Sequence, residues 1–87
     1  MDVAQAIDFY AEQAGMKVAA RFLDEFERVA HLLVEYPGLG TLAKNDRRTF
    51  PLKVFPYSVV YRDMDSGLQI LVVRHQRRKP GYGGGRR

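Results

Sequence analysis

The hydrophobic positions near the start of the chain recur at helical spacing. Residues three or four positions apart form one apolar side, as in an amphipathic helix: Val3, Ala6, Ile7 and Tyr10. Asp2 stands in the place of an N-cap or first-turn acid, and Gly15 stands where a glycine commonly ends a helix. We therefore expect a first helix that opens almost at Met1 and ends at about Ala14.

A longer apolar stripe follows at the same spacing, with charged residues on the opposite side. Its members are Ala19, Phe22, Leu23, Phe26, Val29, Ala30 and Leu33. The stripe predicts a helix from about Lys17 to Tyr36, which Pro37-Gly38 stops. Two helices with a short connection form an antiparallel helical hairpin over residues 1–36. We interpret the phenylalanines as core, and His31 as a half-buried structural histidine rather than a ligand.

The second half of the chain changes from helical spacing to alternation. A surface loop over residues 39–46 leads into a run over 48–55 in which alternate side chains share one side: Phe50, Leu52 and Val54. Pro51 has no N–H to donate to a neighbouring strand, so this strand lies at an edge or is interrupted there. The run therefore predicts a first, imperfect strand.

Two more apolar runs follow, separated by turn residues. Tyr57, Val59 and Tyr61 share one side of the first run, and residues 68–75 are rich in valine, isoleucine and leucine. The turn over residues 63–67 makes the two runs a hairpin. Three sequential strands then form an antiparallel β-meander over 48–75, with one face packed on the helical hairpin. We expect one two-layer α+β domain over residues 1–87, ending in a basic tail over 76–87.

Composition excludes several classes of protein. The 87 residues are 46% hydrophobic, which fits one small globular domain rather than a disordered chain. There is no cysteine, so disulfides and thiolate metal sites are excluded, and the two histidines are far apart in the sequence. No apolar run is long enough to span a membrane, and the start lacks a signal peptide. We expect a soluble cytoplasmic protein with no metal, cofactor or membrane partner.

Charge is distributed unevenly along the chain. Residues 1–43 hold three cations and seven anions, whereas residues 44–87 hold eleven cations and three anions. The net charges of the two halves are therefore −4 and +8. The cations gather on the predicted strands and tail. This asymmetry favours a polyanion or an acidic protein as partner.

The ordered set of segments resembles the RelE/ParE superfamily of type II toxins over nearly the whole chain. The segments are Asp8-Phe9-Tyr10, Arg21-Phe22-Leu23-Asp24, Tyr36-Pro37-Gly38-Leu39-Gly40, the run over 48–62 and the closing run over 72–82. Within this superfamily the sequence is most similar to the ParE-like members, which are often labelled plasmid stabilisation proteins. Members of the superfamily usually begin with a strand before the first helix, and that strand is missing here. The start codon is misassigned or the form is shortened, and a bare sheet edge would allow pairing with a partner strand or a homodimer.

The resemblance implies a growth-arresting toxin that a cognate antitoxin, encoded beside it, neutralises. Two target classes are known in the superfamily, because ParE-like members poison DNA gyrase and RelE-like members cut messenger RNA on the ribosome. We favour the ParE-like mode. The alternatives are a RelE-like, metal-independent mRNA endonuclease and an inactive remnant that still binds antitoxin.

If the protein is an endoribonuclease, the resemblance implies candidate residues for the chemistry. Cleavage without metal needs a base, a cation beside the phosphate and an acid. The candidates are Lys53, Arg62, Arg74, His75 and Tyr82. The two arginines share a side with Val60 and Val72, so buried-stem structural roles are equally good interpretations, and structural roles also suit His75 and Tyr82. As contacts to a partner protein or nucleic acid, the candidates are Arg48, Arg77, Arg78, Lys79 and Tyr82.

Overall fold

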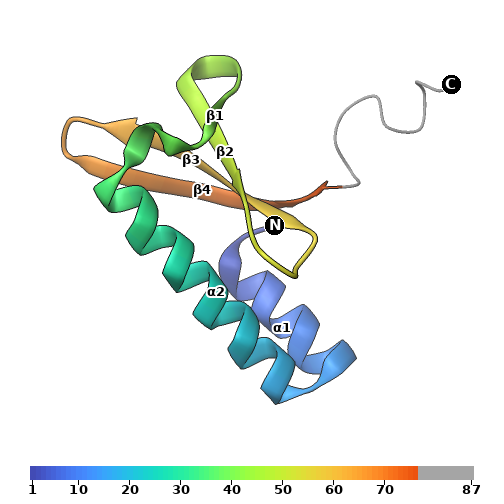
Figure 1. The fold of residues 1–87 in the computed structure, drawn as a ribbon. Helices are drawn as coiled ribbons and strands as arrows, with labels where there is room; N and C mark the ends of the chain where they lie inside the picture. Colours follow the sequence, from blue (N-terminus) through green and yellow to red (C-terminus); the bar gives the residue numbers. More distant parts are fainter. Residues whose placement is uncertain (77–87) are drawn as a thin grey trace, which may run out of the picture.

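The computed structural model describes residues 1–76, in which two helices lie across one face of an antiparallel sheet (Figure 1). The helices are α1 (Val3–Ala14) and α2 (Met16–Glu35), and the strands are β1 (Thr41–Leu42), β2 (Arg47–Pro51), β3 (Tyr57–Met64) and β4 (Gly67–His75). Two short 3-10 turns, Pro37–Leu39 and Lys44–Asp46, flank β1. The two-layer α+β class, the helical hairpin and the antiparallel meander are confirmed.

The start of α1 is fixed by the residue that the sequence suggested. The Asp2 carboxylate accepts a hydrogen bond from the Gln5 backbone N–H at 2.7 Å, and the Gln5 side chain accepts one from the Asp2 N–H at 2.9 Å. This capping box satisfies two N–H groups at the helix start. At the other end Gly15 adopts φ +94°, a value that favours glycine, and the chain turns directly into α2.

The hairpin helices supply one half of the core and the sheet supplies the other half. The buried cluster consists of Ala6, Phe22, Val29, Leu33, Leu52, Tyr57, Val59, Tyr61 and Val73. Phe22 on α2 is fully buried, as predicted. His31 is exposed, so the prediction of a half-buried histidine is wrong. Its position is next to the apolar stripe in sequence but outside the arc of the helix that meets the sheet.

The sheet has the order β1-β2-β3-β4, with every neighbouring pair antiparallel. The register aligns Phe50 with Val59 and Val59 with Val73 on the face that the helices cover. A β-bulge interrupts the pairing of β3 and β4 and leaves Leu71 without a register partner. On both sides of the bulge, residues of β3 that face the helices still pair with residues of β4 that face the helices: Val59 with Val73, and Tyr61 with Ile70.

Two details of the first strands differ from the sequence-based expectation. β2 ends at Pro51 instead of continuing to Phe55, because the chain turns away there and only the Leu52 N–H bonds back, to the Tyr57 carbonyl at 2.9 Å. The segment over 39–46 is also not all loop, since β1 adds a fourth strand beside β2. A strand of two residues is too short to give an alternation signal.

Tyr61 ties the sheet to the chain that leaves α2. Its hydroxyl donates to the Pro37 carbonyl at 2.7 Å and accepts from the Gly40 N–H at 2.9 Å. A Cβ at Gly40 would lie 2.6 Å from that hydroxyl oxygen, so only glycine allows the approach. These contacts position β1 and, with it, the edge of the sheet.

Candidate functional site

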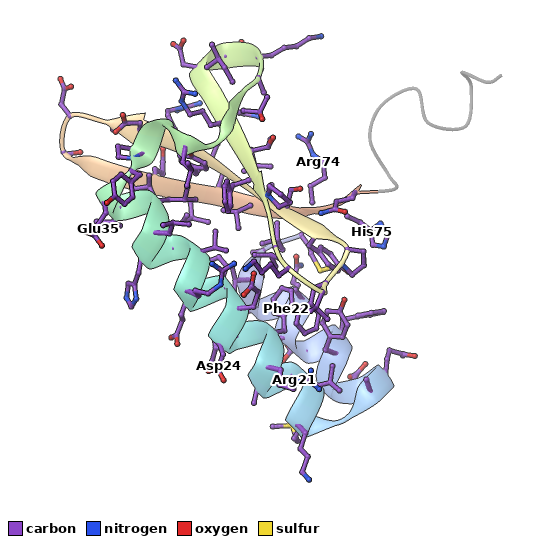
Figure 2. The ribbon with its side chains drawn as sticks, in the orientation of Figure 1. Arg21, Phe22, Asp24, Glu35, Arg74 and His75 are labelled. Atoms are coloured by element: carbon purple, nitrogen blue, oxygen red, sulfur yellow. The ribbon has the colours of Figure 1, made fainter. Side chains whose placement is uncertain are left out.

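The face of the sheet that points away from the helices is the open face, and it carries three arginines. The register places Arg47 opposite Arg62, Thr49 opposite Val60 and Pro51 opposite Ser58, and Ser58 in turn lies opposite Arg74. Figure 2 shows the Arg74 side chain directed away from the two helices. Sequence reasoning had left open whether the helices cover the arginine side. In the structure the helices lie on the other side of the sheet and do not cover it.

The arginines lie at two ends of this open face. Arg62 and the register partner of Arg74, Ser58, are four residues apart on β3, which corresponds to about 13 Å along the strand. Arg62 is half-buried, whereas Arg74 is exposed. The two residues therefore mark opposite ends of this face.

His75 does not face the same side as its neighbour Arg74. The imidazole is half-buried and packs edge-on against the ring of Tyr57, with 5.1 Å between ring centroids. Figure 2 shows the two side chains pointing in different directions from the end of β4. The chemistry proposed for His75 as a proton carrier would thus take place on the helix side of the sheet.

Lys53 lies in the turn between β2 and β3, beside α2. Its backbone N–H donates to the Glu25 carboxylate at 2.6 Å. Arg28 binds the same carboxylate with two hydrogen bonds of 2.8 Å. These bonds, the one from the Arg28 side chain foremost, lower the pKa of Glu25. The turn is thereby held on the helix, away from Arg62 and Arg74.

Val54, at the tip of this turn, is a feature that sequence reasoning missed. Alternation predicted that it shares a side with Phe50 and Leu52, which are half-buried and buried, but the Val54 side chain is 87% exposed. Its φ is +73°, a conformation that β-branched residues rarely adopt. The error follows from the end of β2 at Pro51, because alternation holds only while the chain stays extended.

Arg48, predicted as a partner contact, already has contacts within the chain. Its guanidinium donates to the carbonyl oxygens of Gly40 at 2.9 Å and Gly38 at 3.4 Å. The role predicted for it in partner binding stays a prediction. Four other predicted residues lie outside the described residues: Arg77, Arg78, Lys79 and Tyr82.

An apolar groove of about 680 Å³ runs between α1 and the end of β4. Its wall includes Met1, Phe9, Tyr10, Val72 and Val73. The Phe9 side chain is 45% exposed on this surface. Tyr10 packs deeper, 5.2 Å from the Phe22 ring, and burial raises its pKa.

The free edge of β4 borders this groove. In residues 1–76 the sheet ends at β4, and only Met1 bonds to its outer side. The Met1 amine donates to the Val73 carbonyl at 3.1 Å and the Val73 N–H donates to Met1 at 2.9 Å. The expectation of an incompletely paired sheet edge is therefore met in the described part of the chain.

The described residues offer little for metal binding. Within residues 1–76 no three histidine, cysteine, aspartate or glutamate side chains come together in a way that could hold a metal ion. No helix in the same range is long and apolar enough to cross a membrane.

Comparison with known proteins agrees with this architecture. A solved structure from the chromosomal ParDE toxin–antitoxin system of P. aeruginosa superposes with a TM-score of 0.72 and 23% sequence identity. The match covers 85% of this chain and 83% of that chain, and it establishes the fold. No curated protein sequence matches. The family model described as ParE toxin of type II toxin-antitoxin system, parDE, matches residues 1–80. The chain therefore belongs to the ParE toxin family of type II toxin–antitoxin systems.

Proposed function

We propose that this protein arrests growth by inhibiting DNA gyrase and that a cognate antitoxin neutralises it. The observation that carries the proposal is the ParE family match over residues 1–80. Inhibition of gyrase is the role by which the ParE side of the superfamily differs from the RelE side. A toxin of a two-protein module also implies an antitoxin as its partner.

The geometry supports inhibition over RNA cleavage. Metal-free cleavage needs a base, an acid and a cation within reach of one phosphate. Here Lys53 lies on the helix side beside Glu25, His75 packs on Tyr57, and Arg74 lies on the opposite side of β4 from His75. Within residues 1–76 these candidates do not converge on one phosphate-sized site.

The test adds the purified full chain to gyrase and relaxed plasmid DNA. We expect supercoiling to be lost or cleaved gyrase–DNA complexes to accumulate, and we expect premixed antitoxin to restore supercoiling. Arg74→Ala is compared with wild type in the same assay. This variant removes an exposed cationic side chain that forms no hydrogen bond or ion pair within residues 1–76. Lost inhibition with an unchanged melting temperature would assign Arg74 a role in inhibition.

Two other results would overturn this proposal. Unimpaired gyrase together with cut messenger RNA in a translating extract would assign the protein to the RelE-like endonucleases. Normal growth of cells that express the chain without antitoxin, with gyrase also unimpaired, would identify an inactive antitoxin-binding remnant.

We further propose that the protein acts in the cytoplasm and pairs with a second copy through β4. Both candidate targets, gyrase and the ribosome, are cytoplasmic. The incompletely paired edge of β4 supports the pairing, because free N–H and C=O groups of an edge strand bind another strand readily.

A further inference from the structure

Two arginines face each other on the open side of the sheet. Arg47 on β2 is the register partner of Arg62 on β3, and both are half-buried. In residues 1–76 neither side chain forms an ion pair, and the ion pair that is present joins Arg28 to Glu25. Like charges directly across a sheet repel each other. The pair therefore lacks the counter-charge that such an arrangement requires.

The Arg47 guanidinium also has an unused donor. Its Nε atom is buried and has no hydrogen-bond partner within the described residues. A buried donor on a permanently charged group costs free energy until an acceptor reaches it. An oxyanion seated between Arg47 and Arg62 would supply a counter-charge to both guanidinium groups and remove the repulsion, and a small shift of the Arg47 side chain would then bring Nε to an acceptor.

The rest of the open face has a regular pattern. Next to the arginine pair lie Val60, which is buried, and Val72, which is half-buried. Beyond them, about 13 Å from Arg62 along β3, Arg74 borders a hollow of about 420 Å³. The register positions on this face hold no acidic and no aromatic residue: Thr41, Arg47, Thr49, Pro51, Ser58, Val60, Arg62, Met64, Gly67, Gln69, Val72 and Arg74. The face is therefore cationic at both ends and apolar between them.

We propose that this open face binds an acidic, amphipathic segment of a partner protein. One carboxylate lies between Arg47 and Arg62, an apolar side chain packs on Val72, and a second carboxylate binds Arg74. An extended segment places residues i, i+2 and i+4 on one side, which matches this spacing. Nucleic acid fits less well, because the strand residues that line this face within residues 1–76 include no aromatic ring for base stacking. The inference does not depend on gyrase being the target.

The test measures binding of a short synthetic peptide with the core Glu-Thr-Leu-Thr-Glu to the full chain. We expect Arg62→Met and Arg47→Met each to weaken binding at least about tenfold, because each removes charge-assisted hydrogen bonds. A peptide with the two glutamates adjacent should bind wild type weakly. Inorganic phosphate, titrated at constant ionic strength, should raise the melting temperature of wild type and leave that of both variants unchanged.

The matched control is Arg21→Met, which removes an exposed arginine of α2 on the other layer of the molecule (Figure 2). It should bind the peptide like wild type. Folding is checked by melting temperature in phosphate-free buffer, and Arg47→Met remains informative if Arg62→Met unfolds. Equal peptide binding by wild type and both variants would overturn the site. Absence of peptide binding, with single-stranded DNA bound in an Arg62-dependent way, would instead assign the face to nucleic acid.

Discussion

At the scale of single residues, the Tyr61 hydroxyl has the largest structural role that the sequence did not reveal. Sequence alternation correctly placed Tyr61 on the same side as Val59, because both lie in a regular strand. The two hydrogen bonds of the hydroxyl join residues 21 and 24 positions away. Contacts across such a separation leave no periodic signal in a single sequence, so they could not be predicted.

Replacing Tyr61 by phenylalanine tests these bonds. Loss of the hydroxyl leaves the Gly40 N–H and the Pro37 carbonyl without their partner in a buried place. We expect the free energy of unfolding to fall by about 1–3 kcal/mol, measured by urea denaturation. Tyr36→Phe, at an exposed tyrosine, should change stability by less than about 0.5 kcal/mol. An equal loss in the two variants would contradict this explanation.

Val54 gives a prediction of opposite sign. A non-glycine residue in the left-handed region costs about 1–2 kcal/mol, and this valine gains no burial in return. Val54→Gly should therefore raise the free energy of unfolding by about 1 kcal/mol. Val54→Ala keeps the Cβ and should remain near wild type. If alanine stabilised as much as glycine, the backbone conformation would not be the cause.

At the scale of elements, the helices and strands that could be predicted from the sequence are those with a periodic pattern of hydrophobic residues. The stripes of α1 and α2 extend over several turns, and β3 and β4 alternate over eight and nine residues, so each gave a clear pattern. β1 has two residues and gave none. The end of β2 at Pro51 was one of two alternatives, because a proline is compatible both with an edge strand and with an interruption of the strand.

The candidate site could be predicted only in part, because it depends on register. Alternation gave the correct shared side for Arg62 and Arg74. It could not give the pairing of Arg47 with Arg62, which needs the turn over residues 52–56 to be known. Nor could it show that Lys53 joins α2 through Glu25, which is a contact between layers. The type of each candidate side chain can be read from the sequence, but which of them lie close together is decided by the tertiary structure.

At the scale of the whole molecule, the edge of β4 predicts association. Residues 67–72 present an incompletely paired strand that is mostly apolar, which is the kind of edge that pairs with a second chain. We expect light scattering to show a dimer that forms with increasing concentration. Leu71→Lys, which places a charge on this strand, should remain monomeric.

Val34→Lys is the control for this variant, since Val34 is an exposed residue of α2 and does not belong to the sheet. It should dimerise like wild type. Wild type that stays monomeric at the highest accessible concentration would contradict pairing through β4.

The molecule is two layers thick, about 18 Å along its shortest axis, and one of those layers has an open face. A partner that covers this face binds the folded state and not the unfolded one. At a hundredfold excess over its Kd, such a partner adds about 2.7 kcal/mol to the free energy of unfolding. The unfolded fraction, which proteases attack, then falls about a hundredfold. The open face of the sheet thus links the cellular lifetime of this protein to the concentration of the partner that covers it.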